Sequence, residues 1–207
     1  MKNTVSKAVL AIFLLATAVF SYAAKPLIPL SKQPLASTKI DLALEKIIQE
    51  SPNGVSVKIF KERSFYLQRF DTEVIAGEIF GGTVGHPNDC FVYIKSKRKE
   101  EKIFKMSQKS DQLWHCAGEP VFEAKSIRER DDLLILGMYL FQAPSGDSFY
   151  LPQVIQVTKD GKAHTGDIDH CVDNKTDEEA VSSMNELSKI AAKCIFELGK
   201  LEKTTTK

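Results

Sequence analysis

Four cysteines constrain the fold of this chain more than any other feature. They are Cys90, Cys116, Cys171 and Cys194. In an exported protein, an even number of cysteines is most simply explained by two disulfides. None of the spacings forms the short C-x-x-C pattern of a redox or zinc site, so we expect the cysteines to hold the fold together rather than to react.

The pairing of these cysteines stays open at this stage, because four cysteines allow three connectivities. Short separation along the chain favours Cys90–Cys116 and Cys171–Cys194. Each bridge would close a loop of a few tens of residues, which contributes about 3–4 kcal/mol in the chain-entropy account of disulfides.

The first residues of the chain predict export. Lys2 and Lys7 form a positive segment, and residues 8–20 are apolar with a single exception. This apolar run suits a secretory signal but falls short of the ~20 residues of a membrane-spanning helix. Small residues stand before a cleavage position near Ala23. We therefore expect residues 1–23 to be a cleaved signal peptide and the protein to be periplasmic or secreted; an uncleaved N-terminal anchor is the alternative.

The charges of the chain are nearly balanced. The full sequence has 28 basic and 27 acidic residues, and removal of Lys2 and Lys7 leaves 26 basic residues against 27 acidic ones. Such a balance argues against nucleic acid as the main partner. The rest of the chain has no second apolar segment of membrane length, so we expect no membrane span after cleavage.

The mature chain predicts one domain between two less ordered ends. Residues 24–36 contain three prolines and predict an extended leader. Residues 37–200 have a length that suits a single domain with its own core. Residues 201–207 predict a frayed tail.

A period of two in the apolar pattern, with turn residues between the runs, predicts antiparallel strands. The Asp160-Gly161 pair predicts a tight hairpin after the last of them. Together with a helix at each end of the mature chain, the strands predict an α+β fold: an antiparallel sheet of about six to eight strands, either curved or sandwich-like. The expected strands are 55–59, 64–70, 73–80, 90–95, 102–106, 113–116, 133–142 and 148–158.

The two expected helices have amphipathic patterns. The first follows a Ser37-Thr38 cap, ends at about Gln49, and has one apolar stripe made of Ile40, Leu44, Ile47 and Ile48.

The second expected helix begins at Thr176 and ends near Gly199. Thr176 and Glu179 match a capping box. Residues 163–175, which precede this helix, predict a polar and irregular segment. The apolar face of the helix consists of Met184, Leu187, Ala191, Cys194, Ile195 and Leu198.

The polar segment before the last helix offers the best metal ligands in the chain: His164, Asp167, Asp169 and His170. Imidazole and carboxylate together suit zinc or another transition metal, and carboxylates suit calcium. The spacing matches neither the H-E-x-x-H of zinc proteases nor an EF-hand loop. A polar loop held by Cys171, without a metal, is the alternative interpretation.

A basic cluster, Lys97, Arg98 and Lys99, is expected at the tip of a hairpin. It could bind an acidic surface of a partner protein. The alternative is a solvated tip whose charges discourage edge-to-edge pairing. Cys90, with His86 and Asp89 nearby in sequence, has the residue types of a cysteine nucleophile, but oxidation in an exported protein would remove the thiol.

No catalytic or cofactor motif occurs, so we expect neither catalytic residues nor a cofactor. The favoured hypothesis is an exported, periplasmic protein that binds another envelope protein or an incoming effector, of the inhibitor or toxin-immunity type. One alternative is a metal-assisted hydrolase that uses residues 164–173. Another is a module that binds a small ligand or assists envelope assembly.

Overall fold

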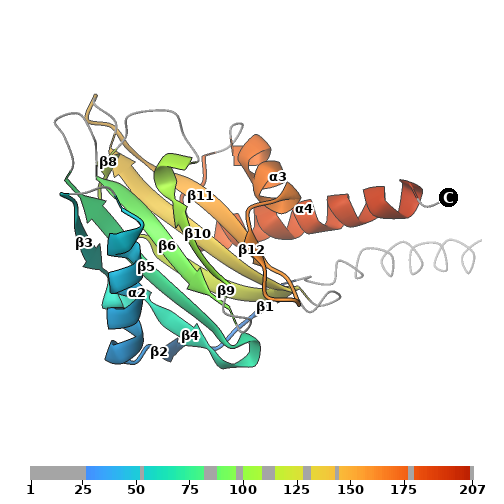
Figure 1. Cartoon of the computed structure of the whole chain (residues 1–207). Helices are drawn as coiled ribbons and strands as arrows, with labels where there is room; N and C mark the ends of the chain where they lie inside the picture. The colour runs from blue at the N-terminus through green and yellow to red at the C-terminus, as the bar shows by residue number, and fades with distance from the viewer. Residues whose placement is uncertain are drawn as a thin grey trace, which may run out of the picture.

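Alternating strands build two antiparallel sheets of six strands each, which pack face to face in the computed structural model of the protein (Figure 1). The structure describes residues 27–51, 54–81, 88–96, 100–108, 115–127, 132–142, 145–176 and 180–205, with side chains up to residue 199. The predicted α+β class and the antiparallel pairing are confirmed, and of the two expected arrangements, curved or sandwich-like, the structure has the sandwich. The expected signal peptide, residues 1–23, lies outside the described residues.

The first sheet is centred on β10, a nearly continuous apolar strand. Both faces of β10 are covered, so its first seven residues are all buried instead of alternating between buried and exposed. β8 also pairs with β10, beside the path of the other strands. The strand order is β1 (Leu27–Pro29), β9 (Val121–Ile127), β10 (Leu133–Gln142), β11 (Ser148–Val157) and β12 (Ala163–His164), with β8 (His115–Cys116).

The second sheet is centred on β5 and β6, which pair over seven residues from Glu73↔Lys95 to Ile79↔Asp89. β3 pairs with β5 beside the main path. Three short 3-10 helices, η1 (Lys61–Arg63), η2 (Gln68–Phe70) and η3 (Met106–Gln108), join strands of this sheet or follow them. The strand order is β2 (Gln33–Pro34), β4 (Phe65–Leu67), β5 (Thr72–Phe80), β6 (Asp89–Lys95) and β7 (Glu101–Lys105), with β3 (Ser56–Ile59).

The main core lies between the sheets and follows the period of two. Residues Val74, Ala76 and Val92 on one sheet meet Ile135, Tyr139 and other residues of the other sheet, and all five are buried. The alternate residues of the same strands point outward and form two further apolar clusters under the helices. The molecule therefore has four layers: helix, sheet, sheet, helix.

Helix α2 (Ser37–Gln49) covers the outer face of the second sheet, and α3 (Asp167–Thr176) and α4 (Met184–Thr205) cover the first (Figure 1). The end of α2 at Gln49 is as expected, but the expected cap is wrong: Ala36 is the N-cap, without a side-chain hydrogen bond, and Ser37 and Thr38 are the first residues of the helix. On α4, Leu187, Ala191 and Cys194 are buried as predicted. In Figure 1, the C-terminal part of α4 projects beyond the sheets.

The proline-rich leader joins both sheets. β1 pairs with β9 of the first sheet and β2 pairs with β4 of the second. Between them, the Lys32 ammonium donates a hydrogen bond to the Phe122 carbonyl oxygen at 2.5 Å and lies 4.7 Å from the centre of the Phe65 ring. The leader is extended, as its prolines predict, and it bridges the two layers of the sandwich at one side.

The two disulfides have the pairing that short separation favours. Cys90–Cys116 joins β6 of one sheet to β8 of the other, with the Cα atoms 5.5 Å apart. Cys171–Cys194 joins α3 to α4, with the Cα atoms 5.9 Å apart. No cysteine is left free. Two disulfides are typical of a protein that folds in an oxidising compartment.

The prediction for residues 163–175 is wrong. This segment is not irregular, because it contains β12 and helix α3. Thr176 is the last residue of α3 and not the cap of the final helix, which begins at Met184. The working cap is Ser183, whose hydroxyl accepts a hydrogen bond from the Glu186 backbone N–H at 3.3 Å.

Two smaller features complete the comparison with the expected elements. The predicted hairpin at Asp160-Gly161 is confirmed, with Gly161 at φ 87° and β11 paired with β12. β9 was not expected as a strand. None of the helices in the described ranges has the length and apolar character needed to cross a membrane.

Candidate functional site

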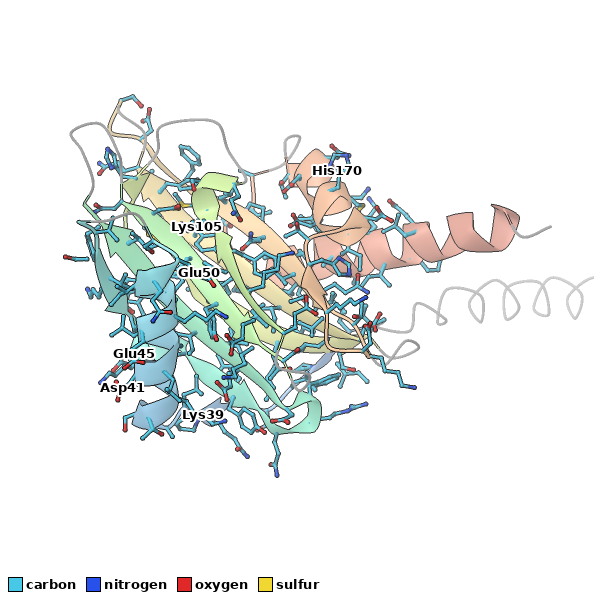
Figure 2. The ribbon with its side chains drawn as sticks, viewed as in Figure 1. Lys39, Asp41, Glu45, Glu50, Lys105 and His170 are labelled. Carbon is cyan, nitrogen blue, oxygen red and sulfur yellow. A yellow bond between two sulfur atoms is a disulfide. The ribbon has the colours of Figure 1, made fainter. Side chains whose placement is uncertain are left out.

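The expected metal ligands do not converge on a common point. His164 lies in β12, whereas Asp167, Asp169 and His170 lie on α3. His170 is exposed on α3 (Figure 2), and Asp169 is buried. Within the described ranges, no three His, Cys, Asp or Glu side chains come together as a metal ion would require.

Asp169 has a structural task at the edge of the first sheet. Its Oδ1 accepts a hydrogen bond from the Val154 backbone N–H at 2.6 Å, in the buried contact between α3 and β11. The Val154 N–H points away from β10, and within the described ranges no strand pairs with β11 on that side at this position, so the carboxylate takes the place of a strand partner. Asp169 therefore anchors α3 to the sheet.

The basic cluster Lys97, Arg98 and Lys99 lies outside the described residues, as does His86. The strands on either side of the basic cluster form the expected hairpin, because β6 and β7 are antiparallel and Lys95 pairs with Glu101. The Lys95 ammonium also lies 3.0 Å from Glu101 Oε1. The first proposed use of this tip, binding of an acidic partner, stays a prediction.

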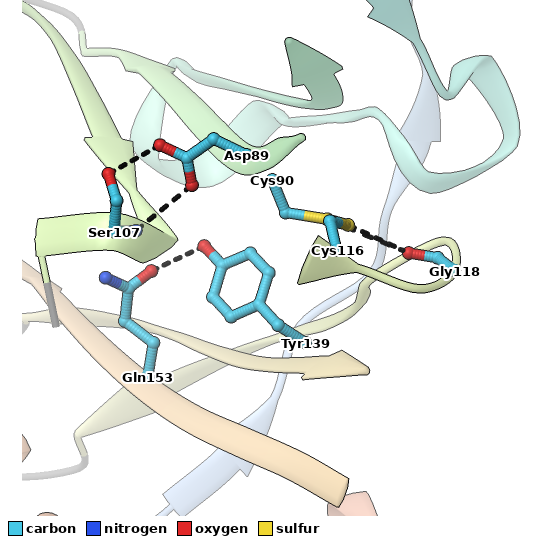
Figure 3. The surroundings of a disulfide bond; sticks show 7 residues. All are labelled: Asp89, Cys90, Ser107, Cys116, Gly118, Tyr139 and Gln153. Atoms are coloured by element: carbon cyan, nitrogen blue, oxygen red, sulfur yellow. Dashed lines mark hydrogen bonds between the residues drawn. A yellow bond between two sulfur atoms is a disulfide. The ribbon is translucent and has the colours of Figure 1, made fainter. Parts of the chain in front are cut away.

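Polar groups near the Cys90–Cys116 disulfide have partners within the fold (Figure 3). The Tyr139 hydroxyl donates a hydrogen bond to Gln153 Oε1 at 2.6 Å, and burial raises the pKa of Tyr139 well above its usual value. Asp89 accepts hydrogen bonds from the Ser107 hydroxyl at 2.6 Å and from its backbone N–H at 3.0 Å. We therefore interpret this cluster as a set of hydrogen bonds that stabilise the sandwich.

Two carboxyl groups at the start of β6 and beside it have a raised pKa. Burial raises the pKa of Asp89, against the hydrogen bonds from Ser107, and also raises that of Glu78. Glu78 is 8% exposed and lies opposite Lys58 in the β3–β5 register. Perturbed carboxyl groups are common in active sites but also occur in structural networks, and no free cysteine or metal ligand set accompanies these two among the described residues.

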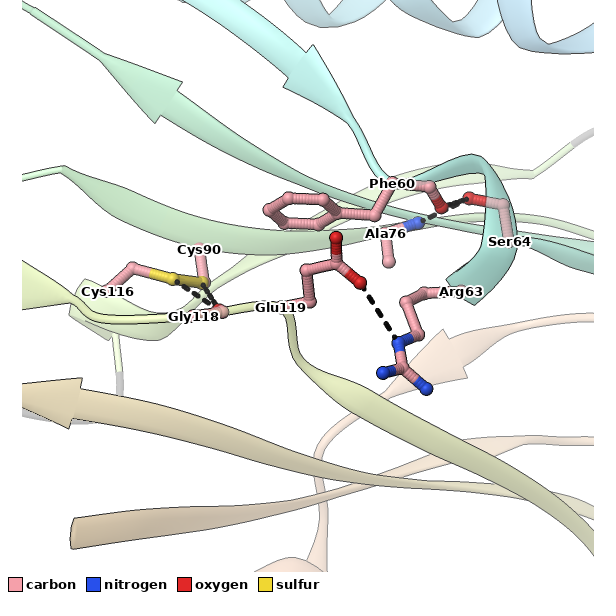
Figure 4. A network of polar contacts seen from close by, with 8 residues as sticks. All are labelled: Phe60, Arg63, Ser64, Ala76, Cys90, Cys116, Gly118 and Glu119. Atoms are coloured by element: carbon pink, nitrogen blue, oxygen red, sulfur yellow. Dashed lines mark hydrogen bonds and ion pairs between the residues drawn. A yellow bond between two sulfur atoms is a disulfide. The ribbon is translucent and has the colours of Figure 1, made fainter.

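A second connection between the sheets runs beside the disulfide (Figure 4). Arg63 Nε, in η1, lies 3.3 Å from the carboxylate of Glu119, which precedes β9. The Gly118 carbonyl oxygen lies 3.3 Å from the Cys116 sulfur and 3.7 Å from the Cys90 sulfur. These contacts hold the two layers together at one end of the sandwich.

Helix α2 differs from the other helices because both of its lysines point toward its own sheet. Lys39 Nζ lies 2.6 Å from the carboxylate of Glu73 in β5. Lys46 Nζ forms an ion pair with the carboxylate of Glu101 in β7. Glu73 and Glu101 lie on the outer face of the second sheet, so each pair ties the helix to the strands below it.

Glu101 is the centre of this arrangement. It receives Lys46 from the helix and Lys95 from the neighbouring strand, and hydrogen bonding to Lys46 is the first cause that lowers its pKa. The same hydrogen bond raises the pKa of Lys46. Tyr93, buried under α2, has a raised pKa because of burial and then because of the negative charge of Glu101.

The inward direction of the lysines leaves an acidic and aliphatic outer face on α2. Leu42 is 62% exposed and Ile48 is 49% exposed. Asp41 and Glu45 are exposed on the same side of the helix (Figure 2). At 100° per residue, these positions and Gln49 fall within about 120° of the helix circumference. We call Asp41, Leu42, Glu45, Ile48 and Gln49 the outer α2 face.

The sequence pattern misplaced one residue of this face. Ile48 was expected on the buried stripe with Ile40 and Ile47, but it is exposed. The buried stripe contains Ala43 instead, which is 3% exposed. Ile40, Ala43 and Ile47 are spaced by three and four residues, which is the narrower and correct stripe. Leu42 belongs neither to the expected stripe nor to the observed one. Its position in the sequence pattern could therefore have indicated an exposed apolar residue.

Comparison of the chain with protein-family models, with curated proteins and with solved structures gives no match.

Proposed function

We propose that this protein is exported and acts by binding another protein through the outer α2 face. Its signal peptide, residues 1–23, would be removed near Ala23, and the protein would act in the periplasm or outside the cell. The class of activity that fits best is inhibition of, or immunity to, an envelope enzyme or an incoming toxin. Binding rather than catalysis is its mode of action in this proposal.

The observation that carries the proposal is the combination of exposed Leu42 and Ile48 with inward-paired Lys39 and Lys46. Burial of an exposed aliphatic side chain at an interface is favourable, by about 25 cal/mol of free energy for each Å² of apolar surface removed from water. Charged residues, lysine among them, are depleted from the cores of protein interfaces, whereas the rims of interfaces are polar. A helix that points its lysines inward and its aliphatic residues outward therefore has the composition of a docking face.

The remaining hypotheses have less support. For a metal-assisted hydrolase, the residues expected to bind the metal lie on different elements, and Asp169 is bound to the Val154 N–H. For a small-ligand module, the interior of a curved sheet would have to be open. Large side chains, including Tyr139 and Phe141, are buried between the sheets instead.

Site-specific photo-crosslinking tests the proposal in cells that export the protein. A benzophenone amino acid at Leu42 or at Gln49 should give one covalent adduct of defined size in the envelope fraction. Mass spectrometry of the adduct then identifies the partner, and an enzyme or toxin whose activity falls on binding would support the inhibitor or immunity class.

Matched controls come from other exposed apolar residues. The same amino acid at Ile28 in β1, 41% exposed, or at Tyr150 in β11, 43% exposed, should give no such adduct. The double variant Leu42→Glu/Ile48→Glu should lower the adduct yield from position 49 at least tenfold while unfolding at an unchanged temperature. Absence of an adduct at positions 42 and 49, or equal adducts at the control positions, would refute the proposal.

A further inference from the structure

The charges of the outer α2 face are all of one sign. Asp41 and Glu45 are spaced by four residues, so their carboxylates are neighbours on the helix surface. Such a like-charge pair destabilises an isolated helix. The only basic residues of α2, Lys39 and Lys46, are paired with Glu73 and Glu101 of the sheet.

Glu50 extends the negative charge past the end of the helix. Its Oε1 lies 3.8 Å from Lys46 Nζ, which is the longer of the two contacts of that lysine. The stronger partner of Lys46 is therefore Glu101, and Lys46 compensates Glu50 only in part. Asp41 and Glu45 have no ion pair with the described lysines and arginines of the chain.

From this pattern we infer that the partner of the outer α2 face is a cationic protein surface with apolar residues at its centre. This inference rests on the proposed function and adds the chemical class of the partner. Leu42 and Ile48 supply apolar contact area, while Asp41 and Glu45 border it with carboxylates. Lysine or arginine side chains around an apolar centre would complement both features, and an acidic partner would be repelled.

The charge pattern also predicts how binding begins. The mature chain is close to neutral overall, so long-range attraction of a cationic partner depends on local charge rather than on net charge. A local acidic face raises the association rate, and salt screens this contribution over about 10 Å at 0.1 M ionic strength. Complex formation at this face is therefore salt-sensitive.

A pair of synthetic peptides tests the inference without knowledge of the partner. One is an amphipathic helical peptide of leucine and lysine; the other has the same leucines with glutamate in place of lysine. In methyl NMR spectra of the exported, disulfide-bonded protein, the leucine–lysine peptide should shift the signals of Leu42 and Ile48. The signal of Ile28, an exposed isoleucine on β1, should stay in place.

Two double variants with equal change in net charge separate local from general attraction. Asp41→Asn/Glu45→Gln should weaken binding of the leucine–lysine peptide about tenfold, as should an increase of salt from about 50 to about 500 mM. Glu62→Gln/Asp167→Asn, at exposed positions elsewhere, should change it less than about twofold. Unaltered thermal unfolding of both variants shows that the fold is retained.

Each outcome decides the inference. It is overturned if the leucine–glutamate peptide binds equally well, if Ile28 shifts as much as Leu42, if no binding occurs, or if both double variants bind alike. A Leu42 adduct in cells together with any of these results would leave the proposed function standing and remove only the cationic partner. Peptide binding at α2 without an adduct in cells would instead remove the proposed function and leave only the preference of this face for a cationic apolar surface.

Discussion

Glu101 determines how helix α2 presents its charges. It lies on β7, at the end of the strand order of the second sheet, and receives both Lys46 and Lys95. Because two ammonium groups and the hydroxyl of Tyr93 interact with one carboxylate, the helix lysine is held against the sheet. Removal of the Glu101 charge would release Lys46 toward Glu50 and the outer α2 face.

Replacement of Glu101 by glutamine should lower the free energy of unfolding by up to about 1 kcal/mol near neutral pH, after allowance for solvent screening. Hydrogen bonding to Lys46 lowers the pKa of Glu101 in the folded protein. Such a carboxyl stabilises the fold above its unfolded pKa of about 4.3 and loses this effect as the pH falls through the lower folded value. Urea unfolding at several pH values should show the difference between the two proteins shrinking below about pH 4.

The control for this pH dependence is Glu45→Gln on the outer α2 face, where no ion pair with the described residues exists. Its effect on stability should be small, because the variant removes no ion pair among the described residues. A Glu101→Gln effect that does not change with pH, or one matched by Glu45→Gln, would contradict the assigned role of Glu101.

At the residue scale the sequence identified polar residues but not their tasks. His164, Asp167, Asp169 and His170 are close in sequence, and this closeness suggested one metal site. In space, a helix turns Asp169 inward and His170 outward, because neighbouring positions on a helix differ by 100°. Without the helix, which the sequence pattern did not predict, the direction of each side chain could not be inferred.

At the scale of elements, two glycines allow aromatic rings to lie across the sheets. A Cβ on Gly77 of β5 would lie 2.4 Å from the Phe91 ring and 2.6 Å from the Lys58 carbonyl oxygen. A Cβ on Gly137 of β10 would lie 2.6 Å from the Phe122 ring. Both rings belong to the residues directly opposite in the register, Gly77↔Phe91 and Gly137↔Phe122.

Replacement of Gly77 by alanine should destabilise the protein by roughly 1–3 kcal/mol, as is usual when a filled core is overpacked. The Phe91 ring is fully buried in the cluster under helix α2, and the Lys58 carbonyl belongs to the backbone of β3, so neither group can move aside freely. Chemical unfolding measures the loss. Gly118→Ala is the matched control, because its Cβ would meet Leu140 at an ordinary 3.5 Å; similar losses in both variants would show that the close approach at Gly77 is unimportant.

Elements with a strong apolar period were predictable, and those without one were not. Helix α2 and the strands β6 and β10 have long apolar runs, and the pattern gave them correctly. α3 has only Ile168 and Val172 as buried apolar residues, among polar residues that are weak helix formers. In β9, buried and partly exposed residues alternate clearly in the structure. Two of the buried residues are alanine and serine, so the sequence shows only a weak alternation of apolar and polar residues.

The capping-box match of Thr176 with Glu179 produced the other error among the helices. Thr176 with Glu179 and Ser183 with Glu186 both match the capping-box spacing. In the structure, Glu186 accepts hydrogen bonds from the hydroxyl and the backbone N–H of Ser182, each at 2.9 Å, and Ser183 caps the helix. Local sequence could not rank the two, because the choice depends on where α3 ends.

At the scale of the whole molecule, the division of the strands into two sheets depends on contacts between distant residues. Each strand reads alike whether its buried face meets a helix or a second sheet, so one curved sheet and a sandwich were equally compatible with the pattern. The disulfide Cys90–Cys116 is the sequence-visible link between the sheets. The exposed outer α2 face also emerges only here, since it depends on sheet carboxylates that lie 34 and 55 residues from the helix lysines.

The two disulfides also set how much the whole molecule depends on its compartment. Their separations along the chain, 26 and 23 residues, are similar. Each should therefore contribute about 3–4 kcal/mol by restricting the unfolded chain. Together they approach the total stability of a typical domain, about 5–15 kcal/mol. The reduced protein should consequently be close to unfolding, or unfolded, at room temperature.

Urea unfolding of three double variants against the oxidised protein measures these contributions. Cys90→Ala/Cys116→Ala and Cys171→Ala/Cys194→Ala should each lower the free energy of unfolding by about 3–4 kcal/mol, and a reduced, alkylated protein should lose most of its structure. The matched control, Ala43→Ser/Ala191→Ser, perturbs buried residues of two helices without touching a crosslink. If the reduced protein is as stable as the oxidised one within about 1 kcal/mol, the chain does not need an oxidising compartment to fold. Export would then rest on the N-terminal segment alone, and a fold that tolerates reduced thiols would be equally suited to the cytoplasm.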